Sequence, residues 1–263
     1  MLDACCRLYL AFVNNSLEQG VGLVLSGGGA RGLAHLGVYR ALIELKVPVK
    51  AVSGTSAGAL AGAFIAAGAA PAVVFKLFRK NRYFGWRNFV WGRDGLFTLR
   101  PMEDLLKQEL PETFSALPIP LHVTCTDVVQ GTSVHLSEGP LCQALLASAA
   151  VPLVFEPQRQ QNRMLVDGGV LNNFPVEPLL ETDLPLIGVH VNRFEPKAAQ
   201  AEWGKFFLAE RCFHLAISGQ VYQKQHHCAL FLDLPLGRYH MFDTDHAEEI
   251  YQIGYEETMK ALS

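Results

Sequence analysis

The sequence predicts an α/β protein with a mainly parallel central sheet. Two buried strands, each followed by a glycine-bearing turn and a helix, occur within about 50 residues of position 20. Strand–turn–helix units in succession are typical of parallel α/β sheets. A length of 263 residues, 50% of them hydrophobic and 18% charged, suits one large domain with its own core.

The first unit begins with the apolar run 21–25. It continues through the glycine run 27–32 into a helix whose apolar residues recur at helical spacing from 34 to 45. The second unit has a strand at 47–53, a turn at 54–58 and a helix of small residues at 59–67. Further along the chain, Ser137 is expected to cap a helix that runs through Ala149.

The remaining segments follow from the same patterns. Residues 1–20 are predicted to be an N-terminal arm and residues 21–263 a single domain, with 70–118 inserted as a helical cap. Further strands are expected near 121–126, 164–166, 186–191 and 230–232, and helices near 203–226 and 245–261.

Composition excludes several classes. The net charge of −3, from 22 basic and 25 acidic residues, gives no reason to expect nucleic-acid binding. The six cysteines show no metal-ligand spacing, so we expect reduced thiols in a reducing, cytoplasmic setting and no metal or cofactor. No apolar run reaches the roughly 20 residues of a transmembrane helix, and the first residues lack the basic start of a secretory signal.

The turn Gly54-Thr55-Ser56-Ala57-Gly58 is the first candidate for chemistry. It has the G-x-S-x-G pattern between a strand and a helix, which is the context of a nucleophile elbow. Such a sharp turn needs neighbours without bulk and projects the serine hydroxyl above the sheet. The simpler alternative is a tight turn with a helix-capping hydroxyl. We interpret Ser56 as a nucleophile.

The glycine run fits two functions. Gly27, Gly28 and Gly29 expose backbone N–H groups at a helix start, as an oxyanion hole requires. The spacing of Gly27, Gly29 and Gly32 also matches a dinucleotide-binding loop, but the acid expected about 20 residues later is missing. We therefore favour the oxyanion hole, with Arg31 either adding positive charge there or forming a structural ion pair.

A serine nucleophile needs a base. Asp167 is the conspicuous aspartate, because it stands at a strand end before Gly168 and Gly169, where a carboxylate can approach another loop. The rival is a histidine-assisted triad, for which the candidates that follow Ser56 are His122, His190, His214, His226 and His240. His35, in the first turn after the glycine run, is expected to pack or hydrogen-bond locally.

Together these motifs resemble those of one family, the patatin-like phospholipases. The matches are Gly27–Gly32 with its oxyanion loop, Gly54–Gly58 with its elbow and Asp167–Gly169 with its aspartate motif. Flanking matches are Ala34–Val38, Ala147–Pro152 and Asn173–Val176. The resemblance covers about residues 20–195 and is greatest to compact bacterial members and to the catalytic domain of neuropathy-target-esterase-like proteins.

The resemblance implies a three-layer α/β/α fold and a Ser56–Asp167 dyad. The amides of Gly28 and Gly29, in a loop with Gly27 and Arg31, would hold the oxyanion. The supporting glycines would be Gly32, Gly54, Gly58, Gly168 and Gly169. The implied activity is hydrolysis of lipid esters, as a phospholipase A, lysophospholipase or carboxylesterase, through an acyl-enzyme. Acyl transfer to another alcohol stays open.

Residues 75–93 combine seven aromatic residues with six basic ones and contain no acid. Aromatic residues mixed with cations suit the surface of an anionic membrane, so peripheral contact with the inner membrane is one hypothesis. The alternative is a cap helix that buries its aromatic residues and leaves its arginines in solvent. Two rival functions also stay open, namely a non-catalytic membrane-associated module of the same fold and a nucleotide-cofactor oxidoreductase.

Overall fold

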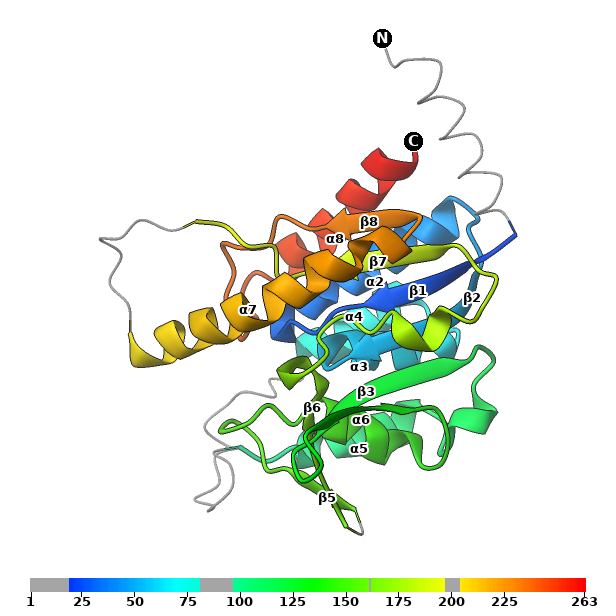
Figure 1. Cartoon of the computed structure of the whole chain (residues 1–263). Coiled ribbons are helices and arrows are strands. Elements are labelled where there is room, and N and C mark those ends of the chain that lie inside the picture. The colour runs from blue at the N-terminus through cyan, green and yellow to red at the C-terminus, as the bar shows by residue number, and fades with distance from the viewer. Residues whose placement is uncertain (1–18, 81–96, 161, 197–203) are drawn as a thin grey trace.

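The computed structural model describes residues 19–80, 97–160, 162–196 and 204–263. Within them, eight strands form one sheet in the order β5-β6-β3-β2-β1-β7-β8, with β4 paired to β3 (Figure 1). The strands are β1 (Val21–Leu25), β2 (Val49–Thr55), β3 (Leu121–Asp127), β4 (Thr132–Leu136), β5 (Gln158–Gln160), β6 (Arg163–Asp167), β7 (Leu186–His190) and β8 (Leu230–Asp233).

The helices are α2 (Leu33–Glu44), α3 (Ala57–Ala66), α4 (Pro71–Lys80), α5 (Arg100–Glu109), α6 (Leu141–Ser148), α7 (Lys205–Lys224) and α8 (Ala247–Leu262). Short 3-10 turns include η1 (Gly29–Gly32), η4 (Gly168–Val170) and η5 (Glu177–Leu179). Strands β3, β2, β1, β7 and β8 run parallel, whereas β4, β5 and β6 pair antiparallel at one side. The predicted mainly parallel α/β sheet is confirmed.

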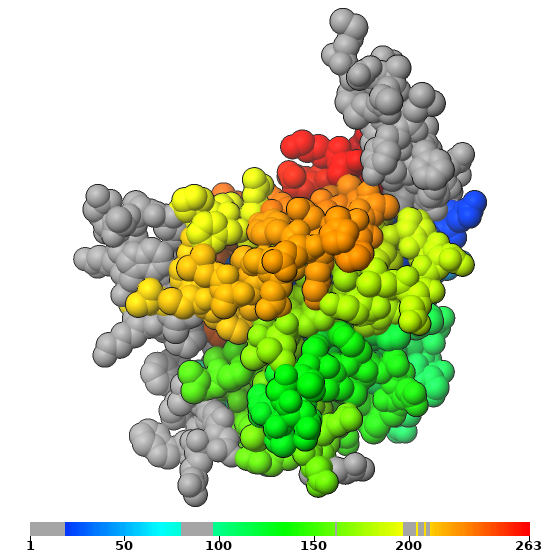
Figure 2. All heavy atoms as spheres, in the orientation of Figure 1, coloured from blue at the N-terminus to red at the C-terminus, as the bar shows by residue number. Residues whose placement is uncertain are grey.

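Side chains of β1 alternate between two cores, because successive residues of a strand point to opposite faces. Val21, Leu23 and Leu25 belong to the larger cluster, with residues of α2, α3, α6 and α8. Val24 belongs to a smaller cluster with Phe174 near η5 and residues including Val221 of α7. The helices thus cover both faces of the sheet, and α7 crosses the near face (Figures 1 and 2).

Some local predictions differ from the structure. The helix expected to start at Ser137 begins at Leu141, after Pro140, and Gly139 has a positive φ of 80°. The Gly-Pro pair interrupts the backbone before the helix, so capping by Ser137 is wrong. Strands β4 and β5 were not expected, because their polar residues carry no buried-strand pattern.

The N-terminal arm falls almost wholly outside the described residues, and so does the stretch 81–96 of the predicted cap. The described part of that cap forms α4 and α5. In the ranges that the structure describes, no helix is long and apolar enough to cross a membrane. The four cysteines in those ranges are free thiols, and burial raises the pKa of Cys142 to about 11.

Candidate active site

Ser56 lies between the end of β2 and the start of α3, in a left-handed backbone conformation with φ 52° and ψ −122°. Only a very tight turn holds a serine in this region, since it costs backbone strain. The turn needs glycine at position 58, where a Cβ would lie 2.4 Å from the Leu25 carbonyl oxygen and 2.6 Å from that of Ser26. The strand–turn–helix geometry of a nucleophile elbow is therefore present.

Asp167 ends β6, and the antiparallel pairing of β6 with β3 carries it to the elbow. Ser56 is the side-chain neighbour whose hydrogen-bonding interaction lowers the pKa of the Asp167 carboxyl, and the Gly169 amide donates a hydrogen bond to Oδ1 at 2.7 Å. Asp167 is only 4% exposed and Ser56 8%. The structure thus brings together the two side chains that the sequence motifs single out.

The Asp167 carboxyl has a perturbed acidity. Burial raises its pKa from 3.8 to about 6, although the hydrogen bonds from Ser56 and Gly169 act in the opposite direction. Burial acts this way because it disfavours the charged form of an acid. A carboxylate with a pKa near 6 is a stronger base than an ordinary aspartate, and the shift brings it closer to neutral pH.

The glycine run follows β1 and begins η1. The Gly27 amide donates to the Asn173 carbonyl at 3.2 Å, and the Ala30 amide donates to the Met241 carbonyl at 2.7 Å. Gly28 and Gly29 lie between these two residues, and their amides have no hydrogen-bond partner among the described residues. These two adjacent N–H groups are therefore available to donate hydrogen bonds to an anionic ligand.

Arg31 contacts a histidine of α7. Its side chain is 3% exposed, and its Nη2 lies 3.2 Å from His214 Nε2 on α7. Arg31 is not among the residues that line the apolar pocket beside Ser56.

The supporting glycines lie where a Cβ would collide with a neighbour. The collisions would be Gly32 against Ala57, Gly54 against Gly58, Gly58 against Leu25, Gly168 against Thr124 and Gly169 against Asn173.

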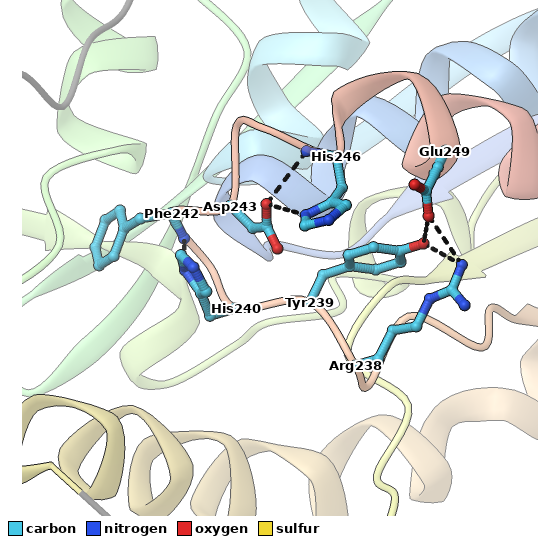
Figure 3. Close-up of polar contacts among 7 residues, drawn as sticks. All are labelled: Arg238, Tyr239, His240, Phe242, Asp243, His246 and Glu249. Carbon is cyan, nitrogen blue, oxygen red and sulfur yellow. Dashed lines mark hydrogen bonds and ion pairs between the residues drawn. The ribbon is translucent and has the colours of Figure 1, made fainter.

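The segment between β8 and α8 was not assigned a role from sequence, yet it covers the glycine run. Its Met241 carbonyl accepts from the Ala30 amide, and its residues Phe242 and Thr244 line the apolar pocket beside Ser56. Its fold is fixed by its own polar contacts: Asp243 Oδ1 lies 2.8 Å from His246 Nδ1, and Tyr239 donates to Glu249 at 2.8 Å (Figure 3). Nothing in its residue types signals a position beside the glycine run.

The histidines that could complete a triad have contacts elsewhere. His190 Nδ1 lies 2.8 Å from Asp233, His214 lies against Arg31, and His240 Nδ1 accepts from the Phe242 amide (Figure 3). The His226 ring lies 4.0 Å from that of His227, and His122 is half-buried. The local role expected for His35 is confirmed, because its Nε2 donates to the Ser26 carbonyl at 2.9 Å and burial lowers its pKa to about 4.

A pocket of about 820 Å³, counting its open mouth, adjoins Ser56. Its described lining carries no charged side chain and comes from the glycine run, α2, α3, α4, α5, the loop after α6 and the segment after β8. The larger side chains among these are Leu33, Leu36, Leu60, Phe78, Met102, Val151, Phe155, Met241 and Phe242. Apolar pockets with a few polar groups at one end are typical of small-molecule sites.

In the described ranges, no three His, Cys, Asp or Glu side chains converge as a metal site would require. Fold and geometry together define a class, namely an α/β protein whose serine elbow and adjoining acid are of the kind that acyl hydrolases carry. The sequence profile of the patatin-like phospholipases matches residues 23–180. The chain therefore belongs to the patatin-like phospholipase family, a family of lipid hydrolases, as its motifs predicted.

Relatives agree with this assignment. An uncharacterized NTE family protein of Mycobacterium tuberculosis is 33% identical over an alignment of 212 positions, which covers 73% of this chain and 56% of that protein. The chain thus spans little more than half the length of this mycobacterial relative. The lysophospholipase nte1 of Emericella nidulans is 26% identical over an alignment of 272 positions including gaps, which covers 90% of this chain and 18% of the relative.

Two solved structures share the fold. VipD from Legionella pneumophila superposes with a TM-score of 0.54 at 17% identity, covering 92% of this chain and 66% of VipD. ExoU from Pseudomonas aeruginosa, in its complex with SpcU, gives a TM-score of 0.52 at 19% identity, covering 92% of this chain and 51% of that one. At these identities the likeness concerns the fold.

Proposed function

We propose that this chain hydrolyses the carboxylic esters of lipids, with Ser56 as the nucleophile and Asp167 as the base. The observation that carries the proposal is the placement of Ser56, in its strained elbow, next to the buried Asp167 carboxylate and at the edge of an apolar pocket. The two amides of Gly28 and Gly29 that lack partners support it, since an ester hydrolase needs donors for the developing oxyanion.

The reaction follows from these positions. As the Ser56 oxygen attacks the ester carbonyl, Asp167 takes the hydroxyl proton, and the Gly28 and Gly29 amides stabilise the negative carbonyl oxygen. The tetrahedral intermediate collapses, and the leaving alcohol takes the proton from Asp167. Asp167 then removes a proton from water, which attacks the acyl-enzyme. Collapse releases the fatty acid and returns the proton to Ser56.

The pocket supports a lipid as substrate. An acyl chain is apolar and would lie among leucine, phenylalanine and methionine side chains, whereas a charged headgroup has no counter-charge in the described lining. The name of the Emericella relative, a lysophospholipase, agrees with a single-chain phospholipid as the first substrate to test. Among the described residues of the aromatic segment, Phe75 is buried and Lys76 exposed, and contact with an anionic membrane stays a prediction.

The test combines a fluorophosphonate label with a panel of lysophospholipids, phospholipids and short-chain esters. Wild type is expected to be labelled and to release fatty acid, and Ser56→Ala to lose labelling and at least about 10⁴-fold of turnover. Ser53→Ala is the matched control, because Ser53 is a fully buried serine on β2 whose hydroxyl has no partner among the described residues. Equal turnover in wild type and Ser56→Ala would refute the proposal and favour a non-catalytic module.

A further inference from the structure

The C-terminal end of α6 contacts the backbone of both proposed dyad residues. The Ser56 amide donates to the Ser148 hydroxyl oxygen at 2.8 Å. The Asp167 amide donates to the Ala150 carbonyl at 2.9 Å, only two residues further along the chain. Ser148 and Ala150 are both completely buried. A single short segment, residues 148–150, therefore holds the elbow on one side and the end of β6 on the other.

The Ser148 hydroxyl has its orientation fixed. While its oxygen accepts from Ser56, its proton goes to the Thr124 carbonyl of β3 at 2.6 Å. That carbonyl also touches the turn after Asp167, since a Cβ on Gly168 would lie 2.3 Å from its oxygen. One hydroxyl and one carbonyl thus link the nucleophile backbone to the aspartate turn through direct contacts.

The elbow has a reason to need this contact. The backbone of Ser56 is strained, and such conformations persist only where the surroundings hold them. The Ser56 amide precedes the first turn of α3, so no helical carbonyl is available to accept from it. Without the Ser148 hydroxyl, a buried N–H would lose its partner, and the backbone could rotate toward a more relaxed state.

We propose that Ser148 is a positioning residue, whose hydroxyl holds Ser56 in the backbone conformation that keeps its side chain against Asp167. This inference rests on the proposed function. The family flank Ala147–Pro152 contains this serine, but a serine in an alanine-rich stretch does not by itself indicate a chemical role. Displacement of a reacting group by about 1 Å can cost about 10²-fold in rate, so a loss of this contact is measurable.

The experiment compares Ser148→Ala with Ser53→Ala, each of which removes one fully buried hydroxyl near the elbow. Ser148→Ala is expected to lower kcat by about 10- to 100-fold at unchanged KM and to slow fluorophosphonate labelling to the same degree. Ser53→Ala is expected to keep wild-type values. Ser148→Thr, which retains the hydroxyl, is expected to recover most of the loss.

A second readout separates positioning from a general loss of stability. The Ser56 hydrogen bond lowers the pKa of Asp167. If Ser56 moves away, the acid limb of the kcat/KM profile is expected to move to higher pH, whereas partial unfolding would only scale the profile down. Should Ser148→Ala fail to fold, Ser148→Cys keeps the shape and has only weak hydrogen-bonding capacity.

Wild-type kcat with an unmoved pH profile in Ser148→Ala would overturn the inference, and so would equal losses in the Ser148→Ala and Ser53→Ala variants. A rise in KM at unchanged kcat would also overturn it, because the contact would then serve binding. These outcomes leave the proposed function intact. Ester turnover that is the same in wild type and Ser56→Ala would instead refute the proposed function itself.

Discussion

Replacement of Asp167 by asparagine is expected to abolish activity and, above pH 6, to stabilise the fold. Asparagine has nearly the same shape but carries no charge. In the folded chain the carboxyl has a pKa of about 6, against an ordinary value of 3.8, because burial disfavours its charge. Each pKa unit corresponds to about 1.4 kcal/mol. The ionised carboxylate therefore destabilises the wild type by about 3 kcal/mol at neutral pH.

The sign of the pH dependence follows from proton binding. Between pH 3.8 and about 6 the folded carboxyl is protonated while the unfolded one is ionised, so the folded state binds more protons. This group's contribution to stability thus falls as pH rises through that window. The variant lacks this dependence, and its stability relative to wild type is expected to grow by about 2.4 kcal/mol from pH 4 to pH 7.

Asparagine has one acceptor oxygen where the carboxylate has two, so the hydrogen bonds from Ser56 and Gly169 cannot both be kept as they are, which costs about 1–3 kcal/mol at every pH. The absolute stability gain is therefore smaller than the pH-dependent part, and the pH-dependent part is the quantity to measure. Urea unfolding of wild type and Asp167→Asn at pH 4.5, 6 and 7.5 gives it directly. A difference between the two that stays constant over this range, or shrinks toward pH 7.5, would refute the assignment of a raised pKa.

Two further predictions concern the glycine run and the pocket. Gly29 has a φ of +59°, and a Cβ there would lie 2.2 Å from the Met241 carbonyl oxygen, so Gly29→Ala is expected to displace an oxyanion donor and lower kcat by about 10²- to 10³-fold. Unchanged ester hydrolysis would contradict this. Phe78→Ala enlarges the pocket and is expected to shift kcat/KM toward longer acyl chains, whereas Phe114→Ala, a buried phenylalanine outside the lining, should leave the preference alone.

Parts of the site were predictable because they are local. The strand at Val21–Leu25 is a continuous apolar run, and the elbow around Ser56 needs small residues at fixed spacing, so sequence alone indicates both. The glycine run signals exposed amides for the same reason. What sequence could not indicate is which amides stay free, since the partners Asn173 and Met241 come from distant segments.

The missed features depend on tertiary pairing. Strand β4 carries only exposed and half-buried residues, and it forms because β3 offers hydrogen-bond partners along its length. Ser148 is one serine in an alanine-rich segment, and its function depends on β3 and the elbow meeting at the end of α6. Residue type alone could not distinguish it from Ser53, which is equally buried and has no partner among the described residues.

The proposed dyad would let a carboxylate serve a serine nucleophile without a histidine. The causes that set the pKa of Asp167 are burial, the Ser56 hydroxyl and the Gly169 amide, and none is a charged side chain. A nearby cation would lower that pKa and weaken the base. The buried cation of the glycine run, Arg31, lies against His214, and burial lowers the pKa of His35 to about 4, which keeps it neutral. Basicity here is therefore a property of exclusion from water, and any substitution that admits water to Asp167 should weaken the base even where the dyad geometry survives.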